Sequence, residues 1–192
     1  MALTLYGYRP SVYTRVARLA LAEKGLSYDY AELNPFAPDP PADYLALHPF
    51  NRVPTLVHDG FVLYETGAIT RYIDRTFAGP ALQPTEPQAM ARMDQIVGIV
   101  DAYAYWPLVR QVYVHAVAMP RRRQAGDPKE MASGLAAAAK VLAALEALVG
   151  GAAFLVDGHP LRRLDAGEEF LPPRFEGGDR ILVVPEIEVV AE

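Results

Sequence analysis

The sequence predicts an α/β domain followed by an all-helical domain, and three observations support this. The first half alternates strand-like and helix-like segments separated by turn residues. The middle of the chain is rich in proline and glycine, as a linker is. The second half carries two long stretches of helical periodicity. The expected divisions are an α/β domain at 1–78, a linker at 79–87, a helical domain at 88–156 and a separate tail at 157–192.

The first elements are read from apolar spacing and from cap and turn residues. Leu3 and Leu5 indicate a short strand. Ser11 then precedes apolar residues at helical spacing that end near Gly25, which is typical of a capped helix. Ser27–Leu33 resembles a second strand. The following loop, 34–41, holds four prolines in eight residues, and a short helix over Asp43–Leu47 comes after it.

A hairpin and a helix complete the first half. Val53–Val57 and Phe61–Tyr64 flank His58-Asp59-Gly60, and Asp-Gly between two apolar runs is a strong hairpin signal. A helix then opens at Glu65-Thr66, where threonine is a good N-cap, and runs to about Phe77. The order β-α-β-α-β-β-α predicts a mixed four-stranded sheet with helices on its faces.

The second half is predicted to be two helices. The first covers 88–119, with a kink expected at Pro107, and the second runs from about 128 to 149. A core stripe is expected along the first helix at Ile96, Val97, Val100 and Ala104.

Composition excludes several function classes. A net charge of −5 argues against a nucleic-acid-binding protein, and the basic cluster Arg121–Arg123 fits a solvated loop. The absence of cysteine excludes disulfides, a thiolate metal site and a cysteine nucleophile. The four histidines have no metal-ligand spacing, so no metal is expected. No signal peptide or uninterrupted apolar span is evident, so a cytoplasmic location without membrane contact is expected.

Three short segments indicate recognition of a small anionic peptide. Val53-Pro54 leads into a strand, and a cis bond there would present a peptide group to an extended ligand, although an ordinary trans proline is the more common case for this dipeptide alone. Glu65-Thr66 begins a helix whose first amides could bind a carboxylate, or it is a plain helix start. Ser11 is either a simple N-cap or a hydroxyl donor to a bound thiolate.

The order and spacing of these segments resemble the glutathione transferases, and most of all their plant-type phi class. The resemblance is strong over 1–77 and looser over 88–155. It rests on the segments Leu5-Tyr6-Gly7, Ser11, Thr14-Arg15-Val16, Glu23-Lys24-Gly25, Tyr44–Leu56 and Leu63–Ile73.

The resemblance implies a thioredoxin-like domain joined to a helical domain, and a role for each site residue. Ser11 would activate the thiol of glutathione, with Tyr13 as a second-ranked hydroxyl. The glutathione-binding residues would be Arg52, Val53, Pro54, Glu65 and Thr66. The partners implied are glutathione as co-substrate, a small apolar electrophile and a second copy of the chain, in a detoxification reaction.

Four residues of the long helix are candidates for the electrophile site. At α-helical spacing they share one face, which gives aromatic walls and a cation. Packing at a domain or subunit interface explains them equally well. They are Tyr103, Trp106, Arg110 and Tyr113.

Three features depart from the family pattern. Asp39-Pro40-Pro41 stands where the family often has a His-Lys pair for the glycyl carboxylate of glutathione, so weaker binding is expected. His48 replaces the usual asparagine. The tail beyond residue 156 lacks helical periodicity, and one hypothesis is a frameshift in the gene. Loss of the usual last helices would lower stability or leave the tail disordered.

Competing functions follow from these departures. The first hypothesis is conjugation of reduced glutathione to electrophiles. The second is a binding or regulatory module with weak or no catalysis, which the missing cation and altered tail favour. The third is another glutathione-dependent reaction, such as isomerisation or peroxide reduction. A thiol–disulfide enzyme is disfavoured because the chain has no cysteine.

Overall fold

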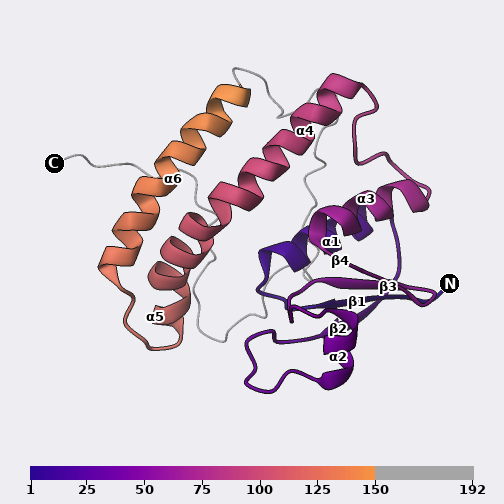
Figure 1. Ribbon diagram of the computed structural model, residues 1–192, viewed down its shortest axis with the longest axis horizontal. Helices are drawn as coiled ribbons and strands as arrows, with labels where there is room; N and C mark the ends of the chain where they lie inside the picture. Colours follow the sequence, from indigo (N-terminus) through magenta and orange to yellow (C-terminus); the bar gives the residue numbers. More distant parts are fainter. Residues whose placement is uncertain (150–192) are drawn as a thin grey trace, which may run out of the picture. The chain divides into compact units, whose positions relative to one another are not determined.

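Four strands form one mixed sheet in the order β2-β1-β3-β4. The computed structural model describes residues 1–149 (Figure 1). β1 pairs parallel with β2 and antiparallel with β3, and β3 pairs antiparallel with β4. The strands are β1 (Leu3–Gly7), β2 (Asp29–Glu32), β3 (Thr55–His58) and β4 (Phe61–Tyr64).

The Asp-Gly hairpin predicted from the sequence is present between β3 and β4. Asp59 and Gly60 both have positive φ angles, of 47° and 88°. A two-residue turn of this kind matches the twist of the flanking strands, and Asp-Gly tolerates it well. The strand before the turn is shorter than expected. It begins at Thr55, so Val53 and Pro54 lie just outside the sheet.

Helices cover both faces of the sheet (Figure 1). The helix α1 (Val12–Glu23) lies beside α3 (Thr66–Thr76) on one face, and α2 (Ala42–Leu47) lies on the other. The predicted element order is therefore confirmed. The core between the sheet and the α1–α3 pair is formed by fully buried aliphatic side chains, chiefly Leu5, Leu21, Leu56, Ile69 and Ile73.

The second half is helical, as predicted, but part of it has a different hydrogen-bond pattern. Much of the expected 88–119 helix is π-helical, with i→i+5 bonds that widen the turn. Ile96 and Ala104 are buried as expected, but Val97 and Val100 are exposed. The predicted core stripe is therefore wrong at these two positions, and the α-helical period on which it relied stops at Val100. The elements are α4 (Pro87–Ile99), η1 (Val100–Ala104), η2 (Trp106–Ala118), α5 (Met119–Arg121) and α6 (Pro128–Val149).

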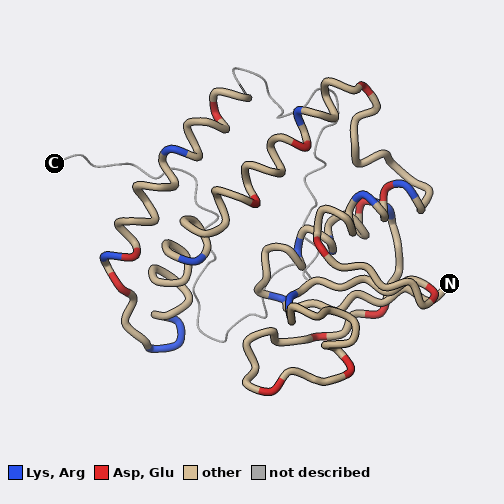
Figure 2. The backbone as a smooth tube through the Cα atoms, in the orientation of Figure 1, with Lys and Arg blue, Asp and Glu red and all other residues tan. Residues whose placement is uncertain are grey.

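Helix α6 packs along η2, and a glycine makes the close approach possible. A Cβ atom added at Gly134 would lie 2.9 Å from the carbonyl oxygen of Pro107 and 2.7 Å from Cβ of Gln111. Figure 2 shows few charged residues along α6. By length and composition alone, the segment Pro128–Leu148 could cross a membrane. A helix in the core of a helical domain meets the same criteria, so this feature by itself does not indicate a membrane protein.

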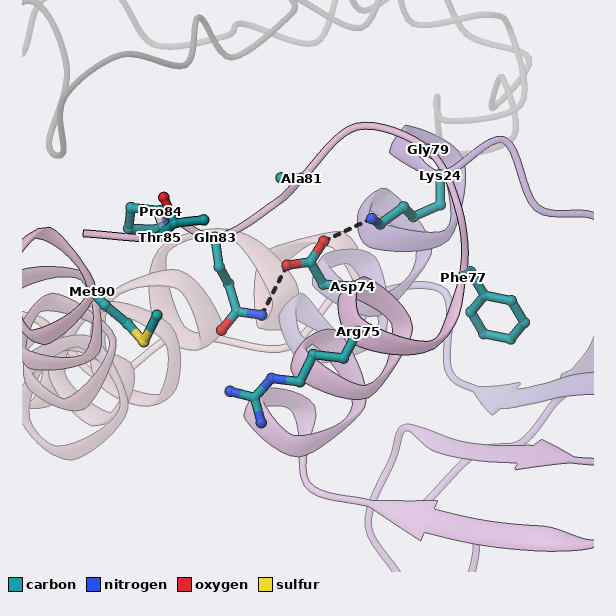
Figure 3. A pocket seen from close by; sticks show the side chains of 10 residues that line it. All are labelled: Lys24, Asp74, Arg75, Phe77, Gly79, Ala81, Gln83, Pro84, Thr85 and Met90. Carbon is teal, nitrogen blue, oxygen red and sulfur yellow. Dashed lines mark hydrogen bonds and ion pairs between the residues drawn. The ribbon is translucent and has the colours of Figure 1, made fainter. Parts of the chain in front are cut away.

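A buried ion pair joins α1, α3 and the segment before α4 (Figure 3). Nζ of Lys24 lies 2.7 Å from Oδ1 of Asp74, and the two side chains are only 2% and 10% exposed. The Asp74 carboxylate also accepts hydrogen bonds of 2.9 Å from the Leu82 N–H and from the Gln83 side chain. These bonds fix the chain where it leaves the sheet domain. A hollow of about 340 Å³ lies beside the pair, and none of the predicted site residues lines it.

The predicted tail lies outside the described residues. The predictions for its altered last helices, its stability and its disorder therefore stay predictions. The divisions at 1–78, 79–87 and 88–156 also stay predictions. The structure does have a segment without helix or strand between α3 and α4.

Candidate functional site

The register of the sheet brings the predicted glutathione-binding segments to one edge. β1 ends at Gly7, and Ser11 follows it. Tyr6 pairs with Thr55 and Thr55 pairs with Tyr64, so the start of β3 and the end of β4 lie at that same edge. Val53-Pro54 and Glu65-Thr66 are the next residues along those strands. Segments more than 50 residues apart in sequence are thus neighbours in space.

Ser11 caps α1 as the sequence predicted. Its Oγ accepts a hydrogen bond of 3.3 Å from the Thr14 N–H, and its backbone has the extended conformation of an N-cap. A serine hydroxyl that accepts one bond still has its own proton to donate. Ser11 is half-buried. Capping and donation to a thiolate are therefore compatible at this residue.

Thr14 holds the loop that carries Ser11, and the sequence reasoning gave it no role. Its side chain is fully buried, and its Oγ1 accepts a hydrogen bond of 3.2 Å from the Tyr8 N–H. A Cβ atom at Gly7 would overlap the Thr14 methyl group, so only glycine allows this packing. The only sequence signal for this role of Thr14 is its position three residues after a serine cap, and that pattern is too common to be informative.

Tyr13, the competing hydroxyl, is already engaged with the helical domain. Burial raises the pKa of Tyr13 to about 12, with further contributions from the charge of Asp101 and a hydrogen bond to it. The ring also packs against Tyr105, with centroids 5.1 Å apart. A hydroxyl bonded to a carboxylate on the helical domain has its proton already engaged. The ranking of Ser11 above Tyr13 therefore gains support.

The Val53–Pro54 peptide bond is cis, as the resemblance implied. Val53 lies outside the strands and makes no hydrogen bond with the other described residues. The neighbouring backbone is held by Tyr44, a buried residue whose hydroxyl donates to the Arg52 carbonyl and lies 2.9 Å from Oγ1 of Thr55. The Arg52 side chain is exposed. Sequence reasoning missed Tyr44 because its partners come from another element.

Glu65, rather than Thr66, is the residue before the helix α3. Thr66 is the first helical residue, so the expectation that it acts as N-cap is wrong. Glu65 has a φ of 71° and makes no capping bond with its side chain, which is exposed. A non-glycine residue with this φ is strained, and such strain is found often at binding sites. The N–H groups of Thr66 and Gly67 have no partner within the described residues.

His48 is buried below this edge. Its ring stacks on Tyr64 with centroids 4.5 Å apart, and its Nδ1 has no hydrogen-bond partner within the described part of the chain. Burial lowers the pKa of His48 despite the nearby charge of Glu65. A buried histidine packed against an aromatic ring supports the structural role expected for it.

The spacing of the four predicted electrophile-site residues does not by itself place them on one helix face. They fall in η1 and η2, where i→i+5 bonding replaces the α-helical period on which the prediction relied. Tyr103 and Trp106 are 64% and 62% exposed, and Tyr113 is also exposed. Arg110 is half-buried, and its guanidinium lies 5.8 Å from the ring centroid of Phe36 in the loop after β2. Their role in binding stays a prediction.

Comparisons with known proteins identify the family. Residues 1–75 match the glutathione S-transferase N-terminal domain. The solved structure of glutathione S-transferase III in its apo form is 30% identical, with a TM-score of 0.69 over 83% of this chain and 74% of that one. The chain belongs to the glutathione transferase family. A theta-class member from Xanthomonas axonopodis pv. citri, solved with glutathione bound, is also 30% identical, with a TM-score of 0.67 over 78% of this chain and 71% of that one.

Curated relatives are similar to this chain over about half of its length. A stringent starvation protein A homologue of Coxiella burnetii is 37% identical over 90 residues, which are 47% of this chain and 42% of that protein. A glutathione S-transferase of Pseudomonas putida is 32% identical over 105 residues, which are 55% of this chain and 46% of that protein. The chain thus matches less than half the length of these two relatives. The thioredoxin-like domain followed by a helical domain, the fold expected from the sequence, is confirmed.

Proposed function

We propose that this chain is a glutathione transferase that conjugates reduced glutathione to electrophilic, largely apolar small molecules. The observation that carries the proposal is the meeting of Ser11, Val53-Pro54 and Glu65-Thr66 at one edge of the sheet. A hydroxyl, a free backbone segment and a helix start are the groups that a thiol-bearing anionic tripeptide requires.

Ser11 supplies the chemistry in this proposal. A free thiol has a pKa of about 8.5, so most of it is protonated at neutral pH. A hydroxyl hydrogen bond together with the positive end of α1 lowers that pKa by roughly one to two units, which is about 1.4 kcal/mol per unit. The bound thiol is then mostly ionised and attacks the electrophile directly. The departing proton goes to solvent.

The remaining residues hold the peptide. Val53, with Pro54 fixing the turn, pairs with the cysteinyl backbone of glutathione, in the manner of a short added strand. The first amides of α3, including that of Thr66, bind the γ-glutamyl carboxylate, and Glu65 binds its ammonium group. Arg52 lies next to this segment in sequence and adds a cation. A phi-class relationship, a cytoplasmic location and a homodimer belong to the same proposal.

A binding or regulatory module is the second candidate. It is favoured by the 37% identity to a stringent starvation protein A homologue and by Asp39-Pro40-Pro41, which supplies no cation for the glycyl carboxylate. In this case glutathione, or a similar peptide, binds at the same edge without turnover.

The test compares the wild-type chain with three variants, using 1-chloro-2,4-dinitrobenzene as electrophile and calorimetry for glutathione binding. Ser11→Ala removes the hydroxyl and the cap, while Ser11→Asp keeps a capping oxygen but places a negative charge beside the sulfur. Tyr13→Phe tests the competing hydroxyl. Thermal unfolding of each variant shows whether the fold is kept.

The conjugation proposal expects turnover in the wild type, and a loss of roughly 10- to 100-fold in both Ser11 variants with glutathione still bound, as expected from a pKa raised by one to two units. Tyr13→Phe should retain turnover. Binding of glutathione by the wild type without any turnover would support the regulatory module. Full activity in folded Ser11→Asp would refute the role of Ser11.

A further inference from the structure

Arg110 is a half-buried cation of η2 whose guanidinium contacts the loop after β2. Within residues 1–149 it forms no ion pair and no hydrogen bond. The acid on the neighbouring helix, Glu130, is held instead by Gln111, at 3.0 Å. A guanidinium offers five N–H donors in a fixed plane, which suits a carboxylate or another planar anion.

The partner of Arg110 is an aromatic surface beside Ser11. Its guanidinium carbon lies 5.8 Å from the centroid of the Phe36 ring, and the Tyr8 ring meets Phe36 edge-on with centroids 6.1 Å apart. The carbonyl of Tyr8 accepts a hydrogen bond of 2.8 Å from the Ser11 N–H. Tyr8 and Ser11 are therefore on the same short loop, and Phe36 reaches Tyr8 from the loop after β2.

Phe36 is held in place although it is well exposed. Its N–H donates to the Asn34 side chain at 3.0 Å, and the Asn51 side chain donates to the carbonyl of Pro35 at 3.3 Å. The ring itself is 64% exposed. An exposed aromatic ring on a held backbone, with a guanidinium on its face, fits a planar ligand that carries an anionic group.

We infer that Arg110, with Phe36 and Tyr8, selects aromatic electrophiles that bear a carboxylate or a similar anionic substituent. The ligand ring lies against Phe36 and Tyr8, and its anion binds the guanidinium. This inference rests on the proposed function and names the substrate class of the same site. It changes the role expected for Arg110, from a wall of an apolar site to a charge-selecting residue.

The reaction for such a substrate is a substitution without redox change. With 4-chloro-3-nitrobenzoate, the glutathione sulfur forms a bond to the ring carbon that carries chlorine. The carbon–chlorine bond breaks, and chloride leaves with the bonding electron pair. The thiol proton passes to solvent, and the ring carboxylate stays intact on Arg110.

The experiment measures affinity for the two reaction products, because binding does not require turnover. One is the glutathione conjugate of 4-chloro-3-nitrobenzoate, and the other is the conjugate of its methyl ester, which has the same ring without the charge. Calorimetry gives the Kd of each conjugate for the full chain and for Arg110→Met, Arg110→Lys and Arg75→Met. Arg75 is an exposed arginine beside the separate hollow, so its variant is the matched control.

The wild-type chain should bind the carboxylate conjugate more tightly than the ester. Arg110→Met should reduce that preference by roughly 10- to 100-fold, which is the contribution of a charge-assisted hydrogen bond. Arg110→Lys should retain part of the preference, since it keeps the charge but loses the planar fork. Arg75→Met should leave the preference as in the wild type.

Three results would overturn the inference. In the first, folded Arg110→Met keeps the wild-type preference. In the second, Arg110→Met weakens both conjugates and glutathione equally, which would place the guanidinium on the glycyl carboxylate of glutathione. In the third, neither conjugate binds. Failure of the proposed function is a separate observation, namely no turnover of either chlorinated substrate by the wild type.

Discussion

Removing the carboxylate of Asp74 should destabilise the chain more than most single substitutions would. The Lys24 ammonium lies 2.7 Å from this carboxylate and is 2% exposed, so it has no access to water. Truncating one member of a buried ion pair typically costs roughly 3–5 kcal/mol, because the remaining charge is buried without a partner. Asp74→Ala also leaves the N–H of Leu82 and the amide of Gln83 without their acceptor.

Substitution of Lys24 should lower the free energy of unfolding less than substitution of Asp74. Lys24→Met removes the charge and keeps an apolar stem of similar length. The Asp74 carboxylate then still accepts two hydrogen bonds and retains some exposure to water, 10% of its side chain. We expect a cost of roughly 1–3 kcal/mol. The double variant Lys24→Met/Asp74→Asn should be more stable than Asp74→Asn alone, because no buried charge remains.

The contribution of the pair should also depend on pH. Burial raises the pKa of Asp74, but hydrogen bonds from Lys24, Leu82 and Gln83 and the charge of Lys24 outweigh it, so the net pKa is lowered. The unfolded chain, with a carboxyl pKa of about 3.9, then binds a proton more readily than the folded chain. The stabilisation is complete above the unfolded pKa and is lost as the pH falls through the folded one.

The assay is urea unfolding followed by circular dichroism for the wild type, Asp74→Ala, Asp74→Asn, Lys24→Met and the double variant, with the wild type and Asp74→Asn repeated between pH 7 and pH 3. The midpoint and slope give the free energy of unfolding. The stability gap between the wild type and Asp74→Asn should shrink as the pH falls below about 4. If Asp74→Asn matches the wild type at pH 7, or the gap stays constant with pH, then the reasoning from the buried pair is refuted.

Two further predictions concern packing and the site backbone. Gly98→Ala should stabilise the chain by about 1 kcal/mol, because a Cβ atom at this position on α4 meets no other atom within 4 Å. Gly134→Ala should destabilise it by about 1–2 kcal/mol, because the added Cβ would meet η2. Thermal unfolding of the two variants checks this, and melting temperatures that shift in the same direction would contradict it. Tyr44→Phe should cost about 1–3 kcal/mol, because the Arg52 carbonyl and Thr55 hydroxyl lose their partner. It should also raise the KM for glutathione, and an unchanged KM would argue against Tyr44 as a positioning residue.

Local signals carried most of the fold prediction. The Asp59-Gly60 turn fixed the hairpin, and Ser11 with the apolar spacing behind it fixed the start of α1, because caps and tight turns depend on adjacent residues. The prediction failed where hydrogen bonding departed from the α-helical period. Val100 was expected in the core and is exposed at the start of η1. Apolar spacing cannot distinguish an i→i+5 pattern from an i→i+4 pattern.

The candidate site was named from the sequence only through resemblance, since its segments are individually ambiguous. A serine cap, an X-Pro bond and a helix start are each common, and no spacing along the chain relates Ser11 to Val53 or to Glu65. Their meeting depends on the register of three strands. The positive φ of Glu65 likewise arises from the way the chain passes from β4 into α3, which is a tertiary constraint.

The sequence by itself determined the order of strands and helices, the hairpin, the capped first helix and the absence of cysteine chemistry. The tertiary structure decided which distant side chains meet: Lys24 with Asp74, Tyr44 with Thr55, and Arg110 with Phe36. The physical reason is that caps, turns and periodicity are set by residues within a few positions. Ion pairs, buried hydroxyl bonds and ring contacts form only after long-range packing has brought their partners together.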